Sequence, residues 1–323
     1  MHSTTELQAR IQEKIDGFCR VNGDEAILQP VNYTMQAGGK RIRPVLALMA
    51  ANLFTDDIDD AVYPALSIEV FHNFTLLHDD IMDRAPLRRG RPTVHEHWDV
   101  NTAILSGDAM LIQAYQLLCK APDKYLRQAL VLFSKTAMDV CKGQQWDMDF
   151  EMRTDVTLPQ YMEMIRLKTA VLLGGAMELG ALIAGADEAD QKHVYDFGEN
   201  LGIMFQLWDD YLDAFGDGNK VGKQTGGDII SDKKTFLLIK AFELADEKQL
   251  IVLSKYSGQR DEPKEKVQAV LEIFEALGLQ QMLEMEMSRY YRNAMQSLQM
   301  VRAEANRKEI IENFAAQLVV REH

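Results

Sequence analysis

Three aspartates, Asp79, Asp80 and Asp83, form a D-D-x-x-D sequence at the end of an apolar stretch. On a helix, positions three and four residues apart lie on the same side, so the three carboxylates would share one face. Carboxylates on one face repel one another unless a cation binds between them. Mg²⁺ takes oxygen ligands from a few carboxylates together with substrate phosphates. A solvated acidic helix end is the ordinary alternative, and a single motif leaves that alternative open.

A second D-D-x-x-D sequence, Asp209, Asp210 and Asp213, again ends an apolar stretch. A cationic loop follows each motif: Arg88-Arg89-Gly90 after the first, and a segment rich in glycine and lysine between residues 216 and 236 after the second. Arginine binds phosphate with two parallel hydrogen bonds. Two acidic triads with cationic loops therefore predict several Mg²⁺ ions that hold one diphosphate, while arginine and lysine neutralise its outer oxygens.

Further polar residues precede the first triad. Lys40 and Arg43 follow two glycines at the start of an apolar run, and exposed amides with cations at a helix start bind phosphate. An ordinary capped helix with solvated cations explains them equally well. His72 lies two helical turns before Asp79 on the same predicted face, which favours a role beside the carboxylates over a purely structural one.

The apolar residues recur with helical spacing in the long intervals between prolines, as between residues 267 and 277. This spacing predicts an all-α protein, and the lack of a repeat or a linker predicts one domain over residues 1–323. Ser106-Gly107-Asp108 is expected to open one helix, with Asp108 as its N-terminal charge. The pair Lys168-Thr169 lies among apolar residues, either as part of a site or as satisfied polar groups in the core.

The composition excludes several classes of protein. The net charge of −14 argues against nucleic-acid binding and against a polybasic membrane anchor. The three cysteines are widely spaced and form no C-x-x-C pair, which indicates a reducing compartment and no thiolate metal site. No segment is long and apolar enough to predict a membrane span or a signal peptide. We therefore expect a soluble, cytoplasmic protein.

Taken together, the motifs resemble those of the trans-isoprenyl diphosphate synthases. The resemblance rests on both D-D-x-x-D triads, the G-G-K-R-x-R-P segment, the R-R-G loop, the K-T pair and the F-Q before the second triad, across residues 38 to 236. It implies the isoprenoid synthase fold, in which mostly antiparallel helices surround a deep central cavity, and a homodimer. It also implies a Mg²⁺-dependent prenyltransferase with three ions in each active site.

The implied reaction is head-to-tail condensation of isopentenyl diphosphate with dimethylallyl, geranyl or farnesyl diphosphate, with release of pyrophosphate. The resemblance makes all six aspartates Mg²⁺ ligands: Asp79, Asp80, Asp83, Asp209, Asp210 and Asp213. It assigns isopentenyl diphosphate to Lys40, Arg43, His72 and Arg89, and the allylic diphosphate to Arg88, Lys168, Lys223 and Lys233. Thr169 and Gln206 would line the reacting carbons. The loop after Lys223 is one residue longer than the family's farnesyl-type pattern, so Lys234 is an alternative to Lys233.

Residues just before the first triad set the product length in this family. Phe74 lies five positions before Asp79 and Thr75 four, and a bulky side chain there stops elongation. An ideal helical wheel instead places Phe74 off the face of the triad. The family rule predicts a product of 15 to 20 carbons, with geranylgeranyl diphosphate favoured over farnesyl diphosphate.

Three other functions compete with this interpretation. A metal phosphohydrolase of the H-D type is suggested by His72 and His78-Asp79, but it needs further histidines and leaves the second triad unexplained. A non-catalytic subunit of a heteromeric prenyl synthase normally lacks acids in its triads, and none is missing here. A terpene cyclase usually replaces the second triad with an Asn/Ser/Glu pattern, which this sequence does not have.

Overall fold

The computed structural model describes residues 1–216, 226–259 and 261–320. Most of them are helical and strands are almost absent among them, so the predicted all-α class is confirmed. The elements are α1 Thr4–Asn22, α2 Gln29–Met35, α3 Ile42–Asn52, α4 Asp59–Met82, β1 Leu87–Arg88, β2 Arg91–Pro92, α5 Val94–His97, α6 Val100–Leu118, α7 Asp123–Glu151, α8 Leu158–Ile165, η1 Arg166–Ala170, α9 Val171–Ile183, α10 Glu188–Phe215, α12 Gly227–Ile230, α13 Phe236–Leu244, α14 Glu247–Tyr256, α15 Pro263–Ala276, α16 Leu279–Met300 and α17 Ala305–Val320.

Side-chain caps fix where several helices begin. Ser3 and Glu6 form a capping box at α1, and Asp99 accepts a hydrogen bond from the N–H of Thr102 at the start of α6. Helix α6 therefore begins at Val100, and the expectation that Asp108 opens this helix is wrong. Asp99 is the cap because its carboxylate reaches a free amide of the first turn, whereas Asp108 lies in mid-helix.

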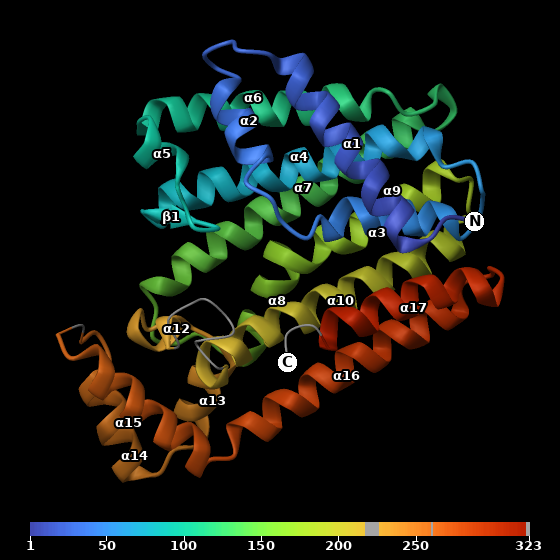
Figure 1. The fold of residues 1–323 in the computed structure, drawn as a ribbon. Coiled ribbons are helices and arrows are strands. Elements are labelled where there is room, and N and C mark those ends of the chain that lie inside the picture. The colour runs from blue at the N-terminus through green and yellow to red at the C-terminus, as the bar shows by residue number, and fades with distance from the viewer. Residues whose placement is uncertain (217–225, 260, 321–323) are drawn as a thin grey trace. The chain divides into compact units, whose positions relative to one another are not determined.

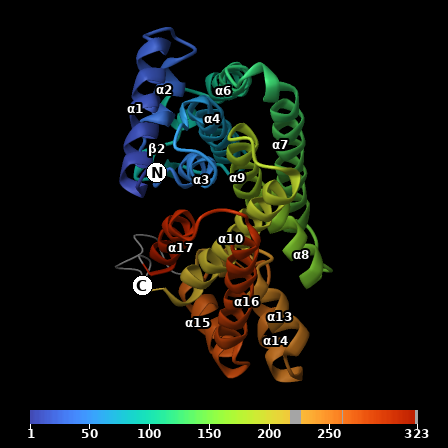
Figure 2. The same ribbon diagram turned by 90° about the vertical axis from the view of Figure 1, so that its right-hand side faces the viewer.

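The chain divides into two compact units. Unit 1 comprises Met1–Lys135, Gly175–Tyr195 and Gln299–Ala316. Its central helix is α4, which packs against α1, α2, α3, α5 and α6 (Figures 1 and 2). Helix α9 approaches α3 very closely, since a Cβ on Gly180 would lie 1.9 Å from the carbonyl oxygen of Ala47. This packing buries α4 on all sides between Pro64 and Phe71, whereas near its carboxyl end Asp79 is half-buried and Asp83 is exposed.

Unit 2 comprises Thr136–Gly174, Asp196–Leu298 and Gln317–His323. It contains the π-helix η1, and glycines of two neighbouring helices press against η1. A Cβ on Gly143 of α7 would lie 2.2 Å from the backbone nitrogen of Lys168, and one on Gly202 of α10 would lie 2.6 Å from the Cα of Ala170. Single π-turns of this kind occur often at functional sites. Helices α13, α14 and α15 pack together elsewhere in this unit (Figure 2).

No helix among the described residues combines the length and the hydropathy that crossing a membrane requires.

Candidate active site

The first triad ends α4 as the spacing predicts. Helix α4 runs to Met82, and the N–H of Asp83 donates to the carbonyl of Asp79 at 2.8 Å. The middle carboxylate, Asp80, is buried and accepts a hydrogen bond of 2.7 Å from Nε of Arg88. Burial raises the pKa of Asp80, although Arg88 opposes the rise. Asp79 is half-buried and Asp83 is exposed, so the outer two carboxylates are those accessible to a ligand.

The R-R-G loop is the turn of a short hairpin between β1 and β2. Arg89 and Gly90 both adopt left-handed backbone conformations, with φ of 51° and 73°, as a two-residue hairpin turn of this hand requires. The guanidinium of Arg89 donates to the carbonyl of Gly38. A Cβ on Gly39 would lie 2.8 Å from that guanidinium, so glycine at position 39 allows the contact. The structure thereby brings together the two cationic segments that the sequence marks as anion sites.

Arg43 and His72 face each other beneath this loop. Nη1 of Arg43 lies 3.0 Å from Nε2 of His72, which accepts a hydrogen bond when the ring is neutral. Burial, followed by the charge of Arg43, holds the pKa of His72 well below its usual value. Burial also lowers the pKa of Arg43 to about 10. The Nε atom of Arg43 is buried without a hydrogen-bond partner among the described residues, so this guanidinium retains a donor that an anion would satisfy.

A neighbouring ion pair supports this group. Arg41 donates to the carboxylate of Glu69 at 2.7 Å, both side chains are buried, and Asn73 also donates to Glu69. The pairing of Arg41 with Glu69 could not be predicted, because an arginine in a basic segment and a lone glutamate in an apolar helix carry no spacing signal. Lys40 is exposed at the edge of the same segment.

Phe74 lies on a different side of α4 from His72. Its ring packs against Phe71 and against His78, with centroids 5.6 and 4.8 Å apart. The ring of His78 in turn lies against α6, where a Cβ on Gly107 would come within 2.2 Å of it. Thr75 is turned back on the helix and donates to the carbonyl of His72. The ring of Phe74 therefore lies beside His78, the residue of α4 that contacts α6.

The second triad, in unit 2, repeats the pattern of the first. Asp209 is exposed, Asp213 is half-buried, and the middle carboxylate of Asp210 is buried. The hydroxyl of Tyr161, also buried, donates to Asp210. Burial, followed by the charge of Asp228, raises the pKa of Asp210 to about 7. Asp213 accepts backbone hydrogen bonds from the first residues of α12, at 3.1 and 2.9 Å.

The polar pair of η1 lies beside this triad. Lys168 donates to Asp147 at 2.5 Å, and the hydroxyl of Thr169 donates to the side-chain oxygen of Gln206 at 3.2 Å. Gln206 reaches Asp210 with a long contact of 3.5 Å. Three of the predicted residues, Thr169, Gln206 and Asp210, are thus linked in unit 2, and Lys168 precedes Thr169 in the chain and binds Asp147.

Two adjacent lysines after the second triad point to different places. Burial lowers the pKa of Lys233, but the four carboxylates around it, those of Asp228, Asp147, Asp210 and Asp209, raise it overall. Lys234 instead donates to the carbonyl of Asp232 and lines a separate cavity. The geometry therefore places Lys233 with the triad.

The predicted ligand Lys223 lies outside the described residues.

These observations can be set beside known proteins. The family model for polyprenyl synthetases matches residues 24–274, which is more than half of the chain. The chain belongs to the polyprenyl synthetase family. The resemblance seen in the sequence is thereby confirmed.

Relatives and solved structures agree with this membership. The geranylgeranyl diphosphate synthase of Sulfolobus acidocaldarius is 38% identical to this polyprenyl synthetase over 88% of each chain. A crystal structure of a geranylgeranyl pyrophosphate synthase covers 100% of both chains with a TM-score of 0.94 and 42% identity. The geranylgeranyl pyrophosphate synthase of Corynebacterium glutamicum, solved with isoprenyl diphosphate and magnesium, covers 98% of both chains with a TM-score of 0.85 and 26% identity.

The carboxylates of this polyprenyl synthetase fit an ion that shares its ligands with a substrate. Among the described residues, no three acidic, histidine or cysteine side chains converge into a closed metal cage. Each unit offers one or two carboxylates from its outer aspartates, which are Asp79 and Asp83 in unit 1 and Asp209 and Asp213 in unit 2. Mg²⁺ is commonly bound in this way, with phosphate oxygens and water completing its shell.

Proposed function

We propose that this polyprenyl synthetase is a Mg²⁺-dependent trans-prenyltransferase that condenses isopentenyl diphosphate with an allylic diphosphate. The observation that carries the proposal is the matching design of the two triads. In each, a partner inside its own unit holds the buried middle aspartate, Arg88 for Asp80 and Tyr161 for Asp210, and one of the outer two aspartates is exposed while the other is half-buried. Family membership and the geranylgeranyl diphosphate synthase relatives support this function.

The six aspartates have unequal roles in this proposal. Asp79, Asp83, Asp209 and Asp213 bind Mg²⁺ directly, while Asp80 and Asp210 act through water or through their protein partners. Bound Mg²⁺ neutralises the diphosphate and so favours its departure from the allylic carbon. Three ions in each active site, serving one diphosphate from both triads, stay a prediction.

The cationic residues divide between two substrates. Arg43, His72, Arg89 and Lys40 bind isopentenyl diphosphate, and the buried unsatisfied Nε of Arg43 supports an anion at this position. His72 is neutral, so its part is to orient the guanidinium of Arg43. Lys168, Lys233 and Arg88 bind the allylic diphosphate, with Lys223 as the residue outside the described part of the chain. Thr169 and Gln206 line the reacting carbons.

We propose geranylgeranyl diphosphate as the main product. The geranylgeranyl diphosphate synthase relatives support a product of 20 carbons, and the family rule assigns the length limit to Phe74 and Thr75. The ring of Phe74 is braced by Phe71 and His78, so it has little freedom to move aside for a longer chain.

We propose a homodimer formed through α6. This helix carries an exposed apolar stripe at helical spacing, with Val100, Ile104 and Ile112 exposed by 47, 41 and 60%, and Leu105 beside it by 56%. Exposed apolar patches on one helix face commonly mark interfaces with a second copy.

A cytoplasmic location and a single functional domain over residues 1–323 also stay predictions.

Neither a phosphohydrolase nor a non-catalytic subunit is favoured. His78 packs between Phe74 and Gly107, and His72 accepts a hydrogen bond from Arg43 when neutral, so neither lies in a histidine cluster of the phosphohydrolase kind. A non-catalytic subunit would not need both intact triads.

The test is the release of pyrophosphate by the purified protein with Mg²⁺. We expect release only when isopentenyl diphosphate and an allylic diphosphate are both present, and none when EDTA replaces Mg²⁺. Release of inorganic phosphate from either substrate alone would support a phosphohydrolase and overturn the proposal.

A further inference from the structure

Unit 2 contains a cavity that the proposed reaction does not use. Its volume is about 650 Å³, within the range of small-molecule sites. Apolar side chains from four elements and a loop line most of it: Val156, Ile229, Leu238, Phe242, Leu253 and Val270. Phe242 is 41% exposed although it lines an apolar space, so a bound apolar chain would cover surface that now meets water.

The charges of the cavity wall are nearly all neutralised, with one exception. Lys266 is buried and bound to Asp232 at 2.8 Å, and it also donates to two backbone carbonyls. The other two lining carboxylates pair with cations outside the wall, Glu243 with Lys240 and Asp155 with Arg153. Lys234 donates only to the carbonyl of Asp232 among the described residues, where it has no carboxylate partner. One cation is therefore left at the wall of an apolar cavity.

Lys234 is not the lysine that lies among the carboxylates of the second triad. Its neighbour Lys233 is the lysine surrounded by Asp228, Asp147, Asp210 and Asp209. Asp232, just before the two lysines, has a left-handed backbone conformation, and its carboxylate binds Lys266 and accepts a hydrogen bond from the N–H of Gly258. The two neighbouring lysines thus lie in different surroundings, Lys233 among carboxylates and Lys234 at the wall of the apolar cavity.

We propose that this cavity binds a single-chain amphiphile with an anionic headgroup. The apolar wall takes the chain, and Lys234 pairs with the headgroup. Because the other charges of the wall are already paired, an uncharged or cationic headgroup gains no equivalent partner. A carboxylate and a phosphate meet the same need, so fatty acids and alkyl or prenyl phosphates are the two sources of this chemistry.

The experiment is calorimetric titration of the full-length protein in EDTA, with decanoate, decyl phosphate and 1-decanol, each below its aggregation threshold. We expect both anions to bind at least about tenfold more tightly than 1-decanol, which is the effect of one charge-assisted hydrogen bond. The tighter of the two anions identifies the natural source. Equal binding of 1-decanol and the anions, or no binding of any of them, overturns the proposal.

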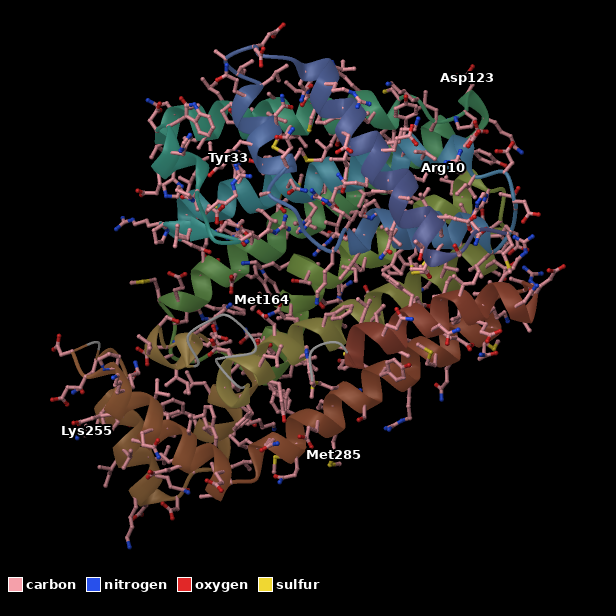
Figure 3. The ribbon with its side chains drawn as sticks, viewed as in Figure 1. Arg10, Tyr33, Asp123, Met164, Lys255 and Met285 are labelled. Atoms are coloured by element: carbon pink, nitrogen blue, oxygen red, sulfur yellow. The ribbon has the colours of Figure 1, made fainter. Side chains whose placement is uncertain are left out.

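Three variants locate the site. Lys234→Met should weaken the anions about tenfold and leave 1-decanol unchanged. Ser254→Trp, at an exposed position of the wall, should abolish binding of all three by filling the cavity. Lys255→Met, which removes the same charge from the residue between the lining residues Ser254 and Tyr256 (labelled in Figure 3), is the matched control and should bind like the parent. Parent-like binding by a folded Ser254→Trp protein overturns the assignment to this cavity. Binding in EDTA without substrates is independent of the proposed prenyltransferase activity.

Discussion

Tyr161 supports the second triad by one hydrogen bond whose loss can be measured. Its hydroxyl is buried and donates to the buried carboxylate of Asp210. Tyr161→Phe keeps the ring and removes only that donor, so Asp210 is left with the long contact to Gln206. A buried hydrogen bond to a charged group contributes about 1.5–3 kcal/mol. We expect the free energy of unfolding to fall by that amount at pH 8 in EDTA.

The assay is urea unfolding followed by circular dichroism, with Tyr33→Phe as the matched control. Tyr33, labelled in Figure 3, also donates one hydrogen bond through its hydroxyl, to the carbonyl of Pro92 at 2.9 Å, but that bond is exposed and neutral. We expect Tyr33→Phe to cost well under 1 kcal/mol, because water replaces the lost partner. Equal losses in the two variants would refute the reasoning that Tyr161 supports a buried carboxylate.

A double-mutant cycle identifies the partner. If the hydroxyl of Tyr161 acts on Asp210, the losses from Tyr161→Phe and Asp210→Asn will be non-additive by about 1 kcal/mol or more. Additive losses would show that the hydroxyl stabilises something else.

The remaining predictions concern product length, pH, metal binding and assembly. Phe74→Ala should yield products longer than those of the parent by mass spectrometry; an unchanged distribution removes Phe74 from the control of length. Burial holds the pKa of His72 below its value in the unfolded chain, so His72 takes up a proton on unfolding and the free energy of unfolding falls as the pH drops below about 6.5. His72→Gln should lessen that fall between pH 7 and pH 5 in urea titrations. An equal fall in the variant would contradict a lowered pKa of His72. Asp79→Ala and Asp209→Ala should each reduce kcat by at least about a hundredfold with helix content unchanged, and full activity of either ends the two-triad account. Ile112→Glu should shift the protein towards a monomer in sedimentation, whereas an unshifted dimer would place the interface elsewhere.

The helical class and both triads could be predicted from the sequence because they rest on local periodicity. Spacing of three and four residues fixes which side of a helix a carboxylate occupies, and α4 and α10 follow that rule. For Phe74 the same rule indicates only a position off the face of the triad. These features depend on no distant contact.

Features that depend on contacts between distant segments could not be predicted. Tyr161 lies far from Asp210 in sequence, and its stretch looks like any apolar helix. The start of α6 could not be predicted, because an aspartate favours a helix N-terminus and both Asp99 and Asp108 precede apolar residues. The choice between Lys233 and Lys234 depends on the left-handed backbone at Asp232, which has no sequence signal in a non-glycine residue.

The most direct test of the proposed function is the mass of its product. The purified protein would be incubated with Mg²⁺ and isopentenyl diphosphate, together with dimethylallyl, geranyl or farnesyl diphosphate in turn. We predict a 20-carbon all-trans diphosphate as the main product from at least one of the three primers. Failure to condense isopentenyl diphosphate with any of the three would contradict the assignment of this chain as a prenyltransferase.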